Sequence, residues 1–106
     1  MGLFTQIDIH HAKELIDTKD VTVVDIRDSG TFDEEHIKSA VLVSDNNIEE
    51  FLKAADKKRP LLCYCYHGIS SQAAAEYFAH NGFEEVYSME GGFEKWKTVY
   101  PFVQSL

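Results

Sequence analysis

Short apolar runs alternate with helix-like segments along the chain, and this alternation most constrains the fold. The runs are rich in Val, Ile and Leu and mostly do not alternate with polar residues, which is typical of strands buried on both faces. Strands that alternate with helices form α/β domains with a mainly parallel sheet. We therefore predict an α/β domain of roughly five parallel strands, with helices on both faces, and with strands at residues 7–9, 21–26, 40–43, 61–64 and 85–88.

Capping residues mark the expected helices. Asp8 and Asp45 each precede a segment with apolar residues at helical spacing, and aspartate is a favoured N-cap. The Ala-rich segment 71–81 predicts a helix that ends at Gly82. Residues 31–37 fit a short helix or turn, and the Gly91-Gly92 turn leads into a last helix. The apolar residues at helical spacing are Ala12, Leu15 and Ile16 in the first helix and Ile48, Phe51, Leu52 and Ala55 in the third; the last helix is expected to carry Phe93, Trp96 and Val99.

The charge of the chain restricts its partners. The 106 residues suit a single domain over 1–106, with 10 Lys and Arg against 18 Asp and Glu and a net charge of −8. Nucleic-acid binding usually requires a basic surface, and the one basic run, Lys57-Lys58-Arg59, is expected to be a solvated loop. We therefore expect no nucleic-acid partner, and any small anionic substrate would have to be held by local dipoles.

Cys63 and Cys65 are the two cysteines of the chain, and their spacing fits neither a disulfide framework nor a four-ligand zinc site. A reducing compartment is the simplest interpretation. Apolar runs stay well below the roughly 18 residues of a membrane helix, and the first residues lack a signal-peptide pattern. We therefore expect a cytoplasmic location, no membrane partner and no metal.

Cys65 stands at the carboxyl end of the predicted strand 61–64, where sites form in open α/β sheets. The loop after it leads into a helix, so backbone N–H groups and the helix dipole would favour a thiolate. Gly68 allows the loop to bend, and Ser70 and Ser71 supply hydroxyls. This is where a nucleophilic cysteine would stand. Cys63, deeper in the apolar run, is expected to be an inert core residue.

From the spacing alone, we expect His67 to be a loop residue that faces solvent. Four further motifs follow one another along the chain: Val23-Val24-Asp25-Ile26-Arg27-Asp28, then His36-Ile37 before Ala40, then Cys65-Tyr66-His67-Gly68-x-Ser70-Ser71, and last Val86-Tyr87-Ser88 with Gly91-Gly92-Phe93-Glu94-x-Trp96. In this order and spacing, the chain resembles the single-domain rhodaneses of the GlpE type over nearly its whole length.

The resemblance implies a rhodanese-like fold and a thiosulfate sulfurtransferase that needs no cofactor. The Cys65 thiolate would attack the outer sulfur of thiosulfate and become a persulfide, which a thiophilic acceptor such as cyanide or a dithiol protein (thioredoxin) would then discharge. The substrate-binding loop would consist of Tyr66, His67, Gly68, Ile69, Ser70 and Ser71. A non-catalytic rhodanese-like binding or regulatory module is the alternative.

The chain also departs from the family pattern. Many rhodaneses carry Arg or Lys within the active loop, whereas this loop has neither between Cys65 and Ser71. The family stretch Gly-His-Ile-Pro-Gly-Ala corresponds to residues 35–40, which we interpret as structural. Arg27 is expected to pair internally with a flanking aspartate, and Trp96 and Gly91-Gly92 to serve packing and turn geometry. Phosphatases need an arginine at the position of Ser71, and thioredoxin-like enzymes need C-x-x-C, so both are disfavoured.

Overall fold

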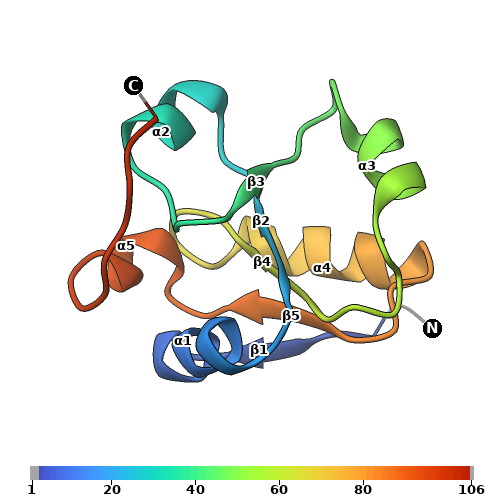
Figure 1. The fold of residues 1–106 in the computed structure, drawn as a ribbon, viewed down its shortest axis with the longest axis horizontal. Helices are drawn as coiled ribbons and strands as arrows, with labels where there is room; N and C mark the ends of the chain where they lie inside the picture. Colours follow the sequence, from blue (N-terminus) through green and yellow to red (C-terminus); the bar gives the residue numbers. More distant parts are fainter. Residues whose placement is uncertain (1–2, 106) are drawn as a thin grey trace.

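The computed structural model describes residues 3–105, so Met1, Gly2 and Leu106 of the predicted 1–106 domain lie outside the described residues. Strands and helices alternate along the chain (Figure 1). Their order is β1 (Thr5–Ile7), α1 (Ile9–Thr18), β2 (Thr22–Asp25), α2 (Ser29–Glu34), β3 (Val41–Leu42), α3 (Ile48–Ala54), β4 (Leu61–Tyr64), α4 (Ser70–His80), β5 (Val86–Met89) and α5 (Gly92–Trp96).

The five strands form one parallel sheet in the order β1-β5-β4-β2-β3, which confirms the predicted fold class. β4 is the central strand, and its residues alternate between two apolar cores. Leu62 and Tyr64 pack in a core that includes residues of α1 and α5. Leu61 and Cys63 pack in a second core with residues of α4, and part of α3 borders it. Both faces of the sheet are therefore covered by helices, which explains why the strand runs read as continuously apolar.

The boundary between β1 and α1 differs from the prediction of a strand at 7–9. Asp8 is the N-cap of α1, because its Oδ1 accepts a hydrogen bond from the His11 N–H at 2.8 Å. Ile9 is therefore the first helical residue, and the strand lies earlier, at Thr5–Ile7. The capping role predicted for Asp8 is confirmed, and as a capping residue it could not also be mid-strand.

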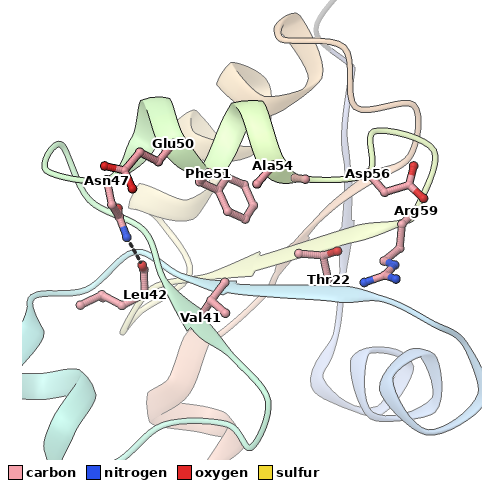
Figure 2. A pocket seen from close by; sticks show the side chains of 10 residues that line it. Thr22, Val41, Leu42, Asn47, Glu50, Phe51, Ala54, Asp56 and Arg59 are labelled. Atoms are coloured by element: carbon pink, nitrogen blue, oxygen red, sulfur yellow. Dashed lines mark hydrogen bonds between the residues drawn. The ribbon is translucent and has the colours of Figure 1, made fainter.

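The cap predicted for α3 is wrong by two residues, because Asn47 and not Asp45 precedes the helix. The Asn47 side chain turns back toward β3: its Nδ2 donates to the Leu42 carbonyl at 2.8 Å (Figure 2). Its Oδ1 accepts from the Ser44 N–H at 2.8 Å. The Asn47 side chain therefore bonds within the turn between β3 and α3 and makes no capping hydrogen bond to the helix.

Two other predictions need correction. Val99 lies beyond the end of α5 and is 53% exposed, so the last helix does not carry it as predicted. The basic run is only partly solvated. Lys57 is half-buried, lies over the Phe83 ring at 5.2 Å and donates to a backbone carbonyl, and Arg59 pairs with Asp20 at 3.1 Å.

The end predicted for α4 is confirmed, since Gly82 has φ +98° directly after the helix cap.

Ser39 adopts a left-handed backbone conformation, with φ +73°, just before β3. Non-glycine residues meet a steric cost there, because Cβ crowds the neighbouring carbonyl oxygen. The resembled family has glycine at this position. The adjacent His36 and Ile37 are buried, and His36 stacks on Phe32 with ring centroids 3.9 Å apart, so this stretch has the packing of a structural segment.

We expect Ser39→Gly to raise the free energy of unfolding by about 0.5–1 kcal/mol, because the strain at Cβ disappears and only part of the gain is lost to greater freedom of the unfolded chain. Urea unfolding followed by circular dichroism measures the change. Ser39→Ala is the control: it keeps Cβ and should give no such gain. Equal stabilisation by both variants would contradict the assignment to backbone strain.

Candidate active site

Cys65 directly follows the central strand β4, and α4 begins five residues later at Ser70. Residues 65–69 therefore form a short loop at the carboxyl edge of the sheet, where the sequence placed the site. The Cys65 side chain is almost buried, with 7% of the residue exposed. A thiol that opens only slightly to solvent can be reached by a small reactant and is shielded from bulk water.

Three hydrogen-bonding groups of the loop surround the Cys65 sulfur. The Gly68 N–H lies 3.1 Å from Sγ and the Ser71 N–H 3.3 Å from it, and the Ser71 hydroxyl oxygen is 3.5 Å away. Gly68 has φ +87°, and a Cβ there would lie 2.7 Å from the Gly91 nitrogen. Only glycine therefore lets the loop turn its N–H groups inward.

This environment sets the ionisation of Cys65. Burial acts to raise the pKa of the thiol and is the largest single effect. The hydroxyl and N–H of Ser71 act in the opposite direction, as do the N–H groups of Gly68 and His67. Together they hold the pKa of Cys65 below its ordinary value, because they stabilise the thiolate more than the thiol.

Cys63 has the opposite properties. It is fully buried on the face of β4 that packs toward α4, and its Sγ lies 3.3 Å from the Ser71 carbonyl oxygen. Burial, with a smaller effect of the neighbouring Cys65, raises the pKa of Cys63 to about 12. Its thiol is therefore neutral at physiological pH, and the core position predicted for it is confirmed.

Backbone N–H groups at the start of α5 hold the loop of residues 65–69 in place. The Phe93 N–H donates to the Cys65 carbonyl at 2.9 Å, and the Glu94 N–H donates to the Tyr66 carbonyl at 3.0 Å. This approach is possible only because position 92 is glycine: a Cβ there would overlap the Tyr66 carbonyl oxygen and lie 2.7 Å from that of Cys65. The packing role predicted for the Gly91-Gly92 turn is therefore also a role in shaping the active loop.

The remaining loop residues differ in their exposure. Tyr66 is half-buried, whereas Ile69 is 73% exposed and Ser70 is also exposed. His67 faces solvent, as its spacing predicted, and its Nδ1 lies 2.9 Å from Glu94 Oε1. Of the predicted loop residues, Gly68 and Ser71 make the hydrogen bonds to the Cys65 sulfur described above, and the His67 N–H also acts to lower its pKa.

Two residues that sequence reasoning missed contribute to the site. Gln72 Nε2 donates to the Gly68 carbonyl at 3.0 Å and so braces the loop. The hydroxyl of Ser88 lies 2.8 Å from that of Ser71. Ser88 left a signal in the sequence, because it is a small polar residue within the short apolar strand that ends at Met89, and a buried polar residue needs a partner.

A cavity of about 450 Å³ opens at Cys65. Arg27 is part of its wall and is held by Asp25, whose Oδ2 lies 2.7 Å from Nη2, so the predicted internal ion pair is confirmed. Nη2 also donates to the Glu35 carbonyl at 2.6 Å. Arg27 therefore joins the end of β2 to the end of α2 beside the Cys65 sulfur. The lining residues are Ile26, Arg27, Asp28, Thr31, Cys65, Tyr66 and Ser70.

A second cavity, of about 480 Å³, lies between β3 and α3, where Figure 2 shows Phe51 and Ala54 above the strand edge. Its wall contains no nucleophilic thiol, and Glu50, Asp56 and Arg59 at its rim come from exposed positions. Size alone therefore does not single out a candidate site; the backbone N–H groups that face the Cys65 sulfur favour the cavity beside it.

Among residues 3–105, no three His, Cys, Asp or Glu side chains gather in a way that could hold a metal ion. Within that same part of the chain, none of the helices has the length and apolar character needed to cross a membrane.

Known proteins resemble this chain over most of its length. The family model for the rhodanese-like domain matches residues 8–99. Curated proteins named thiosulfate sulfurtransferase GlpE are similar: that of Coxiella burnetii is 44% identical over 93% of this chain and 92% of its own length, and that of Pseudomonas fluorescens is 46% identical over 95% and 92%.

Solved structures share the fold. A rhodanese-related protein from Thermoplasma volcanium superimposes with a TM-score of 0.80 at 26% identity, covering 94% of this chain and 98% of that one. The BH2092 protein from Bacillus halodurans gives a TM-score of 0.79 at 28% identity, covering 96% and 78%.

We expect the two thiols to differ in reactivity. In the folded protein iodoacetamide should modify Cys65 alone, with a rate that falls as the pH drops through a pKa below the ordinary value of about 8.5, because only the thiolate reacts. Cys63 should react only after unfolding. Peptide mapping by mass spectrometry identifies the modified residue. Modification of Cys63 in the native state at neutral pH would contradict this division.

We expect Gly92→Ala to disrupt the site, because its Cβ would displace the carbonyls of the loop and its φ of +61° is already unfavourable for alanine. Gly82→Ala is the matched control, since Gly82 also has positive φ but its Cβ would meet nothing within 4 Å. Both variants should lose about 1 kcal/mol of stability to backbone strain. Gly92→Ala alone should also slow Cys65 alkylation at neutral pH; equal alkylation in the two variants would refute the steric argument.

Proposed function

The chain belongs to the rhodanese-like domain family, and from this we propose that it is a thiosulfate sulfurtransferase in which Cys65 carries the transferred sulfur as a persulfide. The observation that supports Cys65 most directly is that two backbone N–H groups donate to its sulfur, with the Ser71 hydroxyl oxygen 3.5 Å away. Such donors stabilise a thiolate, which is the nucleophilic form of cysteine.

In the first half-reaction the Cys65 thiolate attacks the outer sulfur of thiosulfate. A bond forms between Sγ and that sulfur, the sulfur–sulfur bond of thiosulfate breaks, and both of its electrons leave with sulfite. The product is a Cys65 persulfide that carries the negative charge on its outer sulfur. The inward N–H groups of the loop would stabilise this anion as they stabilise the thiolate, without reorganisation during the reaction.

In the second half-reaction a thiophilic acceptor takes the outer sulfur and the Cys65 thiolate is released. Cyanide serves as an acceptor in assays, and a thiol or a dithiol protein is the acceptor class we propose, in the cytoplasm. Because the sulfur resides on the enzyme between the two steps, ping-pong kinetics are expected. The chemistry balances with the donor and acceptor alone, so we propose no cofactor.

The donor binds as an anion to a protein of net charge −8. We propose that the cavity beside Cys65 receives it and that the loop Tyr66, His67, Gly68, Ile69, Ser70 and Ser71 binds it. Without Lys or Arg in that loop, backbone N–H dipoles and hydroxyls supply most of the attraction. The exposed ring of His67 and the exposed side chain of Ile69 form the outer rim of the loop.

We expect the intact mass of the protein to rise by one sulfur atom after incubation with thiosulfate, and cyanide should remove the added mass. Cys65→Ser should show no gain and no sulfur transfer, because the hydroxyl of serine cannot form the persulfide. Electrospray mass spectrometry of the intact chain makes the measurement.

Cys63→Ser is the matched control, because it replaces the other thiol of the same strand and should keep most of the transfer activity. A folded Cys63→Ser protein without activity would contradict the assignment of Cys65 as the sulfur carrier. No mass gain in the wild type would instead favour the alternative, a rhodanese-like module that binds without catalysis.

A further inference from the structure

Two buried serine hydroxyls form a chain of contacts that begins at the Cys65 sulfur. Ser71 Oγ is 3.5 Å from Cys65 Sγ, and Ser88 Oγ is 2.8 Å from Ser71 Oγ. Both serines are fully buried. Ser88 belongs to β5, where it lies directly opposite Cys63 in the register with β4. β5 is therefore joined by a hydrogen bond to Ser71, the residue whose N–H donates to the Cys65 sulfur.

The direction of these hydrogen bonds follows from the available acceptors. In residues 3–105, Ser71 Oγ is the one hydrogen-bond partner of the Ser88 hydroxyl. If Ser71 donated its proton to Ser88, the proton of Ser88 would be buried without an acceptor, which costs about 1–3 kcal/mol. If Ser88 donates to Ser71 instead, both protons are used, and that of Ser71 is left to point at Cys65.

This arrangement fits a thiolate better than a thiol. A thiolate accepts hydrogen bonds from the Gly68 N–H, the Ser71 N–H and the Ser71 hydroxyl together. A neutral thiol would have to place its own proton toward a hydroxyl that already points at it. In a chain of hydroxyls each donated bond also polarises the next, so the Ser88 bond strengthens the one from Ser71 to the sulfur.

We propose that Ser88 is a positioning residue, which holds the proton of the Ser71 hydroxyl toward Cys65 Sγ and thereby stabilises the thiolate. The catalytic consequence rests on the proposed function, because a more stable thiolate matters for sulfur transfer only if Cys65 is the nucleophile. The effect on the ionisation of Cys65 does not depend on the identity of the sulfur donor, and it can be measured without one.

The test is the pH dependence of Cys65 alkylation by iodoacetamide in Ser88→Ala. We expect the apparent pKa of Cys65 to rise by about 0.5 unit, because a donor that acts through one intervening hydroxyl contributes part of a direct hydrogen bond. Below that pKa the thiolate fraction, and with it kcat/KM for thiosulfate, should fall about threefold. At high pH kcat/KM should return to the wild-type value, which a merely structural defect would not allow.

Tyr87→Phe is the control on the same strand. It removes a hydroxyl from the neighbouring residue, whose hydroxyl bonds Glu85 rather than the active loop. This variant should leave the alkylation profile unchanged. Ser88→Thr and Ser88→Val form a second matched pair, because they have nearly the same shape and differ in the hydroxyl. The pKa of Cys65 should be higher in Ser88→Val than in Ser88→Thr, even if Ser88→Ala does not fold.

A comparison of the single and double variants of Ser71 and Ser88 decides whether Ser88 acts through Ser71. Ser71→Ala should raise the pKa of Cys65 by more than Ser88→Ala does, and adding Ser88→Ala to Ser71→Ala should then have no further effect. An equal shift from Ser88→Ala in both backgrounds, or no shift in any Ser88 variant that lacks the hydroxyl, would overturn the proposal. Absence of a persulfide in the wild type with the pKa shifts intact would contradict the proposed function and leave the positioning role standing.

Discussion

A sulfur atom that is nearly buried and yet ionises more easily than an ordinary cysteine is the feature on which the rest of this structure depends. Burial of Cys65 disfavours the thiolate, and the hydrogen-bond donors of the loop more than compensate. The same apolar surroundings that penalise the charge also strengthen each hydrogen bond to it. Small displacements of the donors therefore change the balance, so the loop must be held in position by the surrounding fold.

The support comes from segments far apart in the sequence. The start of α5 binds the carbonyls of Cys65 and Tyr66, and Gly92 allows that close approach. β5 supplies Ser88, and Arg27 at the end of β2 forms part of the cavity wall while its guanidinium is fixed by Asp25. The order β1-β5-β4-β2-β3 places these segments on either side of β4, so the central strand presents its cysteine between them.

The two cysteines show how strongly local surroundings control chemistry. Cys63 and Cys65 are two residues apart, and both have their sulfur near Ser71. Cys63 meets the carbonyl oxygen of Ser71, an acceptor that disfavours a negative charge, and burial raises its pKa to about 12. Cys65 meets the N–H and the hydroxyl of that residue, and its pKa is lowered. Ser71, at the start of α4, thus places an acceptor beside Cys63 and an N–H donor beside Cys65, and the pKa values of the two thiols shift in opposite directions.

Much of this could be predicted from the sequence, because it depends on local patterns. The apolar runs predict a parallel α/β sheet, and Cys65 at the end of one run, followed by glycine and serines, predicts the reactive loop. The end of β1 and the cap of α3 were less predictable: Asp8 caps α1 as expected and so ends the strand before it, whereas the Asn47 side chain bonds to the Leu42 carbonyl and makes no cap to α3. The hydrogen bond between Ser88 and Ser71, and the need for glycine at position 92, could be recognised only from the tertiary structure. They join residues 17 or more positions apart, and only the packing of β5 and α5 against the loop determines which atoms meet.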